Sequence, residues 1–217
     1  LRYSSKERIM DKSIYEEFIN NVGDKTSNLL ITKKENYRAT PLPYNLSDLE
    51  SDAATLFKYS AKKTMDITQN LRDKYKAITY NRSDCRYLSE EHFKEAPKLI
   101  PLVAEKLNFT ANFNFNEKSR CFNDKYVTAH HGIIPTGAGD FEQFSQEEKN
   151  IYKLIAERYL IQFLEKVKIE KTEAKVEINE AIFKKSSIKI LEPGYTKYFK
   201  VLEDDNENDE EIEEKKE

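Results

Sequence analysis

A short segment around Tyr80 contains the residue types that an attack on a phosphodiester requires. Such an attack needs an oxygen nucleophile, a cation that holds the phosphate, and a group that moves a proton or donates to the developing charge. Tyr80 and Arg82 are two residues apart, so on an extended strand both side chains would project from the same face. The phenol could then attack phosphorus while the guanidinium binds a phosphate oxygen. Asp84 continues this face and could hold Arg82 in place.

The same spacing has a purely structural interpretation. A tyrosine in a strand usually packs against its neighbours, and alternating polar residues usually form a solvated ladder on a sheet surface. Spacing alone favours this structural interpretation, and the chemical one needs independent support.

A second cluster contains two of the three histidines in the chain. His130 and His131 lie in the segment 128–136, where Gly132 and Pro135 disfavour a helix. A neutral imidazole could donate a hydrogen bond to a phosphate, and a protonated one could stabilise its charge. Adjacent histidines on a loop therefore suggest contact with a ligand, with a metal site or plain structure as the alternatives.

The sequence gives little support to a metal site or a disulfide framework. No cysteine or acidic residue stands beside the paired histidines, and Asp140 and Glu142 follow a flexible Gly-Ala-Gly segment. Cys85 and Cys121 are the only cysteines and form no CxxC pair, which fits a reducing cytoplasm. His92, the third histidine, is expected on the surface of a helix.

The residues before Tyr80 predict the elements that would position it. The pattern Ser47-Asp48-Leu49-Glu50 predicts a capping box at the start of a helix. Ser60 is expected to cap a second helix that extends to Tyr75, and residues 77–80 then read as a strand with the tyrosine at its end. Helix, tight turn, helix and strand is the order found in a winged helix, a common DNA-binding module.

Further elements are predicted on both sides of this segment. The expected elements are a helix over 11–22, a strand over 28–33, a helix that begins after Ser89 and that Pro97 and Pro101 bend or split, a loop over 108–116, an amphipathic helix that begins after the Ser145–Glu148 capping box, and strands from Lys168 onward. Strands thus precede and follow a mainly helical region, which indicates an α+β fold.

An acidic tail conceals a mildly basic body. The net charge is -3, but residues 203–217 hold ten carboxylates and two lysines and are expected to be disordered. The remaining residues comprise 34 basic and 29 acidic side chains, a balance that permits electrostatic attraction to DNA. No apolar run approaches the roughly 20 residues that span a bilayer, so no membrane partner is expected. Because Leu1-Arg2-Tyr3 begins neither with methionine nor with a signal peptide, we expect a cut inside a longer protein.

Two motifs carry a specific resemblance. Residues 78–88, Ile-Thr-Tyr-Asn-Arg-Ser-Asp-Cys-Arg-Tyr-Leu, resemble the active-site tyrosine motif of bacterial type IA DNA topoisomerases, and most closely that of the topoisomerase III subfamily. Residues 130–136, His-His-Gly-Ile-Ile-Pro-Thr, resemble the histidine motif of that subfamily. Further blocks match in order and approximate spacing at 41–46, 64–69 and 152–163, so the resemblance covers about residues 35–200.

The resemblance implies roles for the chemical residues. Tyr80 would attack a backbone phosphate of single-stranded DNA, form a 5′-phosphotyrosyl bond and release a 3′-hydroxyl, without ATP. Arg82 would orient the tyrosine and the phosphate, and His130 would contact the scissile phosphate. The residues expected to bind DNA or to support its path are Gln69, Asp84, Arg86, His131 and Thr136.

The resemblance also implies a division into segments of the topoisomerase arch. A mainly helical, winged-helix (CAP-like) cleavage domain would be inserted between β-containing arch segments. The expected ranges are 1–40 for the end of the first arch segment, 41–166 for the cleavage domain with the tyrosine, 167–202 for the returning β segment, and 203–217 for the tail.

The sequence departs from the family pattern in ways that limit its expected activity. Asn81 stands where the subfamily commonly has proline, which would loosen the strand. The family's Toprim domain, with its catalytic glutamate and Mg²⁺-binding acidic run, has no counterpart here, and neither does the second winged-helix segment. We therefore expect no cofactor in this chain, Mg²⁺ in the full enzyme through Toprim, and little relaxation activity alone. The expected partners are single-stranded DNA and those missing domains, in a bacterial cytoplasm at the nucleoid.

Two functions from different classes remain open. Besides part of a topoisomerase, the chain could be a winged-helix DNA-binding module without chemistry, in which Tyr80 packs in the core. The second helix would then supply the phosphate contacts Lys62, Lys63, Arg72, Lys74 and Lys76. A tyrosine recombinase is disfavoured, because its Arg-His-Arg set should precede the tyrosine.

Overall fold

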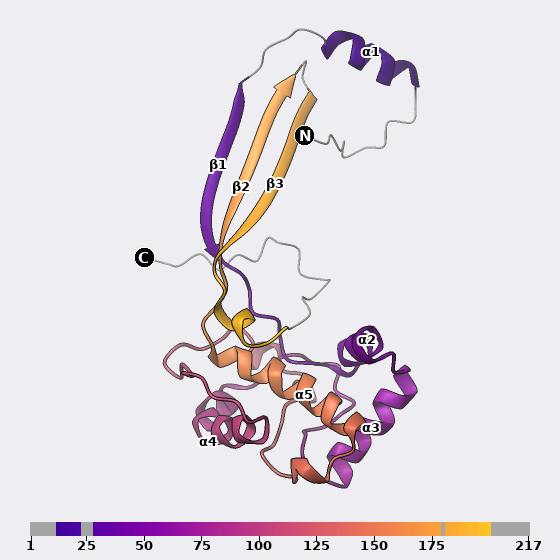
Figure 1. Cartoon of the computed structure of the whole chain (residues 1–217), viewed down its shortest axis with the longest axis vertical. Coiled ribbons are helices and arrows are strands. Elements are labelled where there is room, and N and C mark those ends of the chain that lie inside the picture. The colour runs from indigo at the N-terminus through magenta and orange to yellow at the C-terminus, as the bar shows by residue number, and fades with distance from the viewer. Residues whose placement is uncertain (1–11, 23–27, 179–180, 201–217) are drawn as a thin grey trace. The chain divides into compact units, whose positions relative to one another are not determined.

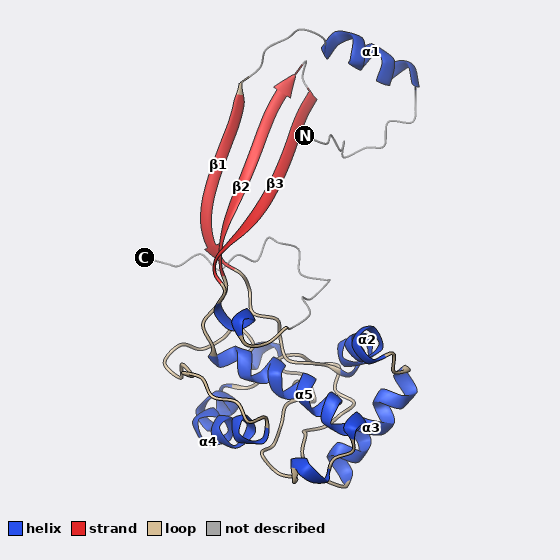
Figure 2. Ribbon diagram, in the orientation of Figure 1, coloured by secondary structure: helices blue, strands red, loops and turns tan. Residues whose placement is uncertain are grey.

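The computed structural model describes residues 12–22, 28–178 and 181–200 (Figure 1). These residues form five α-helices and one antiparallel sheet of three strands, so the mixed α+β class is confirmed (Figure 2). They divide into two compact units. The sheet unit contains the described residues up to Arg38 together with Val167–Pro193, and the helical unit contains Ala39–Lys166 and the described residues from Gly194 onward.

The sheet unit consists of helix α1 (Lys12–Val22) and strands β1 (Leu29–Tyr37), β2 (Lys168–Ile178) and β3 (Ala181–Glu192). The order is β1-β2-β3 with antiparallel neighbours, and both predicted β regions are confirmed, although β1 extends four residues beyond the expected strand. The extension follows the pairing, because β2 is long enough to offer partners up to Tyr37.

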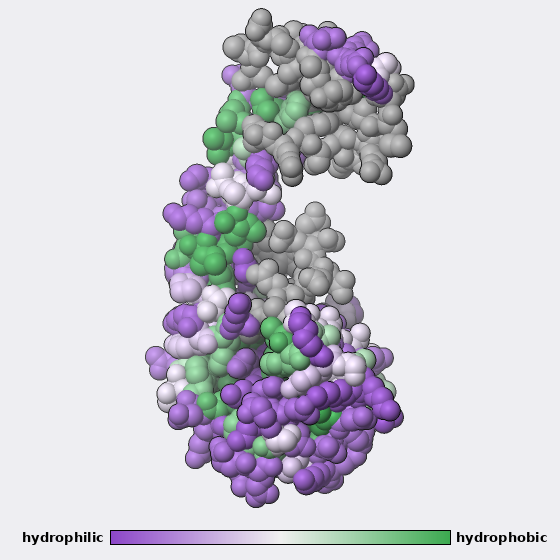
Figure 3. Space-filling model, turned by 45° about the vertical axis from the view of Figure 1, so that its right-hand side comes forward, coloured by the Kyte–Doolittle hydropathy of each residue, from purple (hydrophilic) through white to green (hydrophobic). Residues whose placement is uncertain are grey.

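The surface of the sheet unit carries apolar side chains. Figure 3 shows green patches along the strands, whereas the visible face of the helical unit is mostly hydrophilic. The exposed large apolar residues of the sheet are Leu29, Leu30, Ile31, Ile182, Ile188 and Ile190. The sheet unit therefore buries little apolar surface of its own.

The helical unit is organised around one buried helix. It contains α2 (Leu46–Phe57), α3 (Ala61–Asp73), α4 (Glu90–Lys106) and α5 (Gln146–Leu160). Helix α5 packs against α2, α3 and α4, and it lies at the centre of the unit in Figure 1. Its buried side chains include Ile151, Tyr152, Ile155, Ala156, Tyr159 and Leu160. The loops that carry the motifs are attached to this scaffold.

The predicted helix starts are confirmed for three helices and wrong for one. Ser60, Ser89 and Ser145 each accept a hydrogen bond from a backbone N–H in the first turn. Helix α2 instead begins after Asn45, whose side chain accepts from the Asp48 N–H at 2.7 Å. The Ser47–Glu50 box does not form, because the asparagine amide satisfies the first turn two residues earlier.

Helix α4 continues through both of its prolines, so the expected possibility of a split at these residues is wrong. Pro97 and Pro101 both lie on its exposed side, where water can satisfy the carbonyls that lose their N–H partners. The opposite side carries the continuous buried face Ala96, Ile100, Val103 and Ala104. Packing of that face against the core keeps the helix intact.

The expected strand over 77–80 is wrong. Ile78 forms only an isolated antiparallel bridge with Pro135, and the chain turns at Asn81 and Arg82. Asn81 is fully buried and donates from Nδ2 to Thr68 Oγ1 at 3.1 Å. This anchor to α3 draws the chain inward directly after Tyr80, so no strand continues.

The acidic segment 203–217 lies outside the described residues, so its expected disorder stays a prediction. Among the residues that the structure describes, no helix is long and apolar enough to cross a membrane.

Candidate active site around Tyr80

The tyrosine and histidine motifs meet through a short backbone ladder. Thr79 N–H donates to Ile134 O at 3.0 Å, and Thr136 N–H donates to Ala77 O at 3.0 Å. The Thr79 hydroxyl accepts from the Ile134 N–H at 3.0 Å. Two segments more than fifty residues apart in sequence are thus fixed together immediately beside Tyr80.

Gly132 allows the histidine loop to approach closely. Its N–H donates to Tyr87 O at 2.9 Å, and the next N–H, of Ile133, donates to Tyr44 O at 2.7 Å. A Cβ atom on Gly132 would lie 3.1 Å from Pro43 Cβ and 3.2 Å from the Arg86 carbonyl. Absence of a side chain at this position therefore lets the loop lie where His130 can reach Tyr80.

Tyr80 lies against two groups that can carry positive charge. Its ring centroid is 4.1 Å from that of His130, with an interplanar angle of 33°. The Arg72 guanidinium carbon lies 4.9 Å from the same centroid. Tyr80 is half-buried and His130 is exposed, and the Tyr80 hydroxyl makes no hydrogen bond with the described residues. A polar substrate could therefore reach this hydroxyl from solvent.

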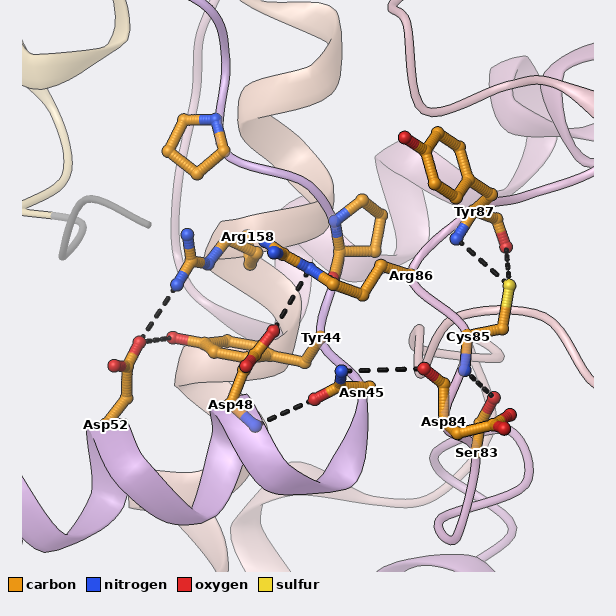
Figure 4. Close-up of polar contacts among 12 residues, drawn as sticks. Tyr44, Asn45, Asp48, Asp52, Ser83, Asp84, Cys85, Arg86, Tyr87 and Arg158 are labelled. Atoms are coloured by element: carbon orange, nitrogen blue, oxygen red, sulfur yellow. Dashed lines mark hydrogen bonds and ion pairs between the residues drawn. The ribbon is translucent and has the colours of Figure 1, made fainter. Parts of the chain in front are cut away.

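Arg82 is positioned by α3 and not by Asp84. After the turn at residues 81–82 the guanidinium is exposed, and Nη2 donates to Gln69 Oε1 at a long 3.5 Å. Gln69 in turn donates from Nε2 to Asp73 Oδ2. Asp84 is exposed and its backbone carbonyl accepts from Asn45 Nδ2 (Figure 4). The expected common face of Tyr80, Arg82 and Asp84 is wrong because the segment is not a strand.

Two residues expected to bind DNA also hold the loops in place. Arg86 is largely buried, with Nε 3.1 Å from Asp48 Oδ2 and donating to Pro43 O at 3.4 Å (Figure 4). The Thr136 hydroxyl donates to Lys76 O and accepts from the Ala138 N–H at 3.2 Å. DNA binding by either residue stays a prediction.

His131 lies against His92, a contact that the sequence did not predict. Its ring centroid is 4.2 Å from that of His92, and its Nδ1 lies 2.8 Å from Gly132 O. His92 is half-buried, not a surface residue, and its Nδ1 accepts from the Ser89 N–H at 3.3 Å in a reciprocal capping box. Burial and the neighbouring His131 lower the pKa of His92. The Ser-x-x-His spacing was the available signal.

A buried polar network lies beneath the loop that precedes α2. The Tyr44 hydroxyl donates to Asp52 Oδ2 at 2.5 Å, and Arg158 Nη2 donates to the same oxygen at 2.9 Å (Figure 4). The Arg158 guanidinium carbon is also 4.4 Å from the Tyr44 ring centroid. Burial raises the pKa of Tyr44, so its hydroxyl stays protonated and donates. Arg158 falls at helical spacing from Ile151 and Ile155, a pattern that could have identified it.

The comparisons with known proteins decide the family. The model of the DNA topoisomerase family matches residues 1–217. DNA topoisomerase 3 of Haemophilus influenzae is 36% identical over 208 residues, which cover 94% of this chain and 32% of that protein. The chain belongs to the type IA DNA topoisomerase family. Within it, DNA topoisomerase 3 of Vibrio cholerae is 38% identical over 157 residues, covering 68% of this chain and 24% of that protein.

A solved member of the family has a similar fold. The structure of full-length topoisomerase I from Thermotoga maritima matches with a TM-score of 0.56 and 23% identity, over 92% of this chain and 34% of that chain. The chain spans about a third of the length of the curated topoisomerase 3 relatives that it matches.

Proposed function

We propose that this chain carries the DNA-cleaving tyrosine of a topoisomerase III-like enzyme. The observation that supports it best is the position of Tyr80. Its ring lies 4.1 Å from that of His130 and within reach of Arg72, and its hydroxyl makes no hydrogen bond to the residues that the structure describes. Arg82, bonded to Gln69, lies two residues further along the chain. A nucleophile surrounded by groups able to bind a phosphate suits phosphodiester attack.

The proposed step exchanges one phosphate ester for another. The Tyr80 oxygen forms a bond to phosphorus, the bond from phosphorus to the 3′ oxygen of the DNA breaks, the phenol loses its proton, and the 3′ oxygen takes one. Arg82 and His130 bind the phosphate oxygens while charge develops. Reversal of the same step rejoins the strand without ATP, and passage of another strand in between permits relaxation or decatenation.

We propose that Mg²⁺ binds to parts of the full enzyme other than the segment that this chain represents. Among the described residues, no group of three or more histidine, cysteine or acidic side chains is placed to hold a metal ion. The site around Tyr80 consists of a phenol, imidazole rings and guanidinium groups. These groups can bind a phosphate, but they are not the carboxylate ligands that Mg²⁺ prefers. The Toprim domain, the second winged-helix segment and single-stranded DNA are the proposed partners, in the bacterial cytoplasm.

The helical unit is proposed to be the winged-helix-like cleavage domain, and the sheet unit the adjoining arch segments. Support for this assignment comes from α2, the short turn before Ser60 and α3, which pack together and lead directly to Tyr80. This order places the nucleophile just after the second helix of a helix-turn-helix pair.

A covalent trapping experiment tests the proposal. The full chain is mixed with the portions of the Haemophilus influenzae enzyme that it does not match, Mg²⁺ and a single-stranded oligonucleotide labelled at its 3′ end. A 5′-phosphotyrosyl bond keeps this label on the protein after denaturation. We expect a labelled adduct that Tyr80→Phe abolishes.

The same experiment distinguishes DNA cleavage by Tyr80 from the alternative function, a DNA-binding module without chemistry. Salt-sensitive DNA binding without an adduct under any condition would favour that alternative and contradict cleavage by Tyr80. Because Toprim is proposed to be required, the chain alone with Mg²⁺ should not relax supercoiled plasmid, and detectable relaxation would contradict that requirement.

A further inference from the structure

The last turn of α3 connects the two chemical side chains of the site. Gln69, Arg72 and Asp73 lie at this end of the helix. Gln69 contacts Arg82, from which it accepts a hydrogen bond, and Arg72 contacts Tyr80, over whose ring it lies. Asp73 holds both, because its Oδ2 accepts from Gln69 and its Oδ1 lies 3.3 Å from Arg72 Nη1.

We infer that Arg72 is a further positioning residue of the proposed reaction, which holds the Tyr80 ring and stabilises negative charge on its oxygen. The inference rests on the proposed function. In rejoining, the DNA 3′ oxygen attacks phosphorus, the bond from phosphorus to the Tyr80 oxygen breaks, and the electron pair passes to that oxygen before it takes a proton. A fixed guanidinium beside the ring favours this charge.

The geometry suits a guanidinium more than an ammonium group for holding the ring. Arginine is planar, stacks on aromatic faces and keeps its charge at all relevant pH values. The ion pair with Asp73 restricts Arg72 to this position, although both side chains are about half exposed. His130 and Arg72 lie against the Tyr80 ring, and Asp73 pairs with Arg72. Arg82 stands two residues after Tyr80 and bonds to Gln69.

Single-turnover adduct formation with the supplemented full chain measures this role. We expect Arg72→Gln to slow the reaction about tenfold at neutral pH, a barrier change typical of one lost electrostatic contact. Arg72→Lys keeps the charge but loses the planar group that stacks on the ring. It should therefore lose less than Arg72→Gln and stay within about threefold of the unsubstituted chain.

Matched controls distinguish charge from packing. Lys98→Gln removes the same charge from the exposed side of α4 and should leave the rate unchanged. Thermal denaturation checks that each variant is folded, and Arg72→Lys carries the test if Arg72→Gln does not fold.

Three outcomes would overturn the inference. An unchanged rate in Arg72→Gln would exclude any role. Equal losses in Arg72→Gln and Arg72→Lys would show that Arg72 only packs against the ring, and would overturn its role in stabilising charge on the oxygen. Absence of an adduct from the unsubstituted chain would overturn the proposed function and this inference with it, whereas the first two outcomes leave the proposed function intact.

Discussion

At the residue scale, the least expected feature is an arginine in the core. Arg158 is only 2% exposed, and its charge is matched by Asp52, which also accepts from the Tyr44 hydroxyl. A buried ion pair contributes little net stability, but removal of one partner leaves the other charge uncompensated. The network links α2, α5 and the loop before α2, which is the loop that the histidine segment contacts.

Arg158→Met should therefore lower the free energy of unfolding by about 3 kcal/mol. Urea denaturation measures this change. Arg158→Met combined with Asp52→Leu should recover part of the loss, because no buried charge then remains alone. As a control, Lys153→Met on the exposed side of α5 should change stability by less than about 0.5 kcal/mol. Equal stability of Arg158→Met and the unsubstituted chain would refute the structural role of the pair.

At the element scale, the start of α4 depends on a neutral histidine. His92 Nδ1 accepts from the Ser89 N–H, and an imidazolium cannot accept there. Burial has the largest effect on the pKa of His92 and lowers it. Among the neighbouring groups, His131 also lowers this pKa, whereas Glu95, Glu91 and Asp124 raise it.

This arrangement predicts that acid weakens the helical unit. Because the pKa of His92 in the folded protein lies below its unfolded value near 6.5, the unfolded state binds the proton more readily. The stability contribution is complete above about pH 6.5 and is lost as the pH falls through the folded pKa. Thermal denaturation at several pH values measures the slope.

His92→Gln is the matched variant for this measurement. Glutamine at the third helical position still completes a capping box but does not titrate. The variant should retain the stability of the unsubstituted chain at pH 7.5 and lose less of it toward pH 5.5. Identical pH slopes for the two proteins would rule out His92 as a source of the acid sensitivity.

At the scale of the whole molecule, the two units differ in how much they bury. The side chains of β1 are almost all exposed, whereas most of α5 is buried. Local opening costs less free energy where few apolar contacts are lost.

Hydrogen exchange should reflect this difference. The backbone amides of β1, β2 and β3 should exchange at lower protection than those of α5, because the sheet can open while the helical core stays folded. Mass spectrometry of peptides from both units after timed exchange measures this order. The central strand β2 is the critical comparison, and protection of β2 equal to that of α5 would contradict it.

The sequence by itself determined most of the helices, the β regions on both sides of them and the family. Local signals suffice for these, because Ser60, Ser89 and Ser145 cap their helices through backbone groups only three residues away. The motif around Tyr80 likewise named the candidate nucleophile, and the family match agrees with the resemblance on which that candidate rests.

Only the tertiary structure decided what surrounds the nucleophile. The turn at Asn81 depends on a hydrogen bond to Thr68 on α3, so local strand propensity could not predict it. Arg72 meets Tyr80 because the chain folds back onto its own helix, and His130 meets it because a ladder joins segments fifty residues apart. Such contacts depend on how α3 and the loops pack, which no spacing within a single segment records.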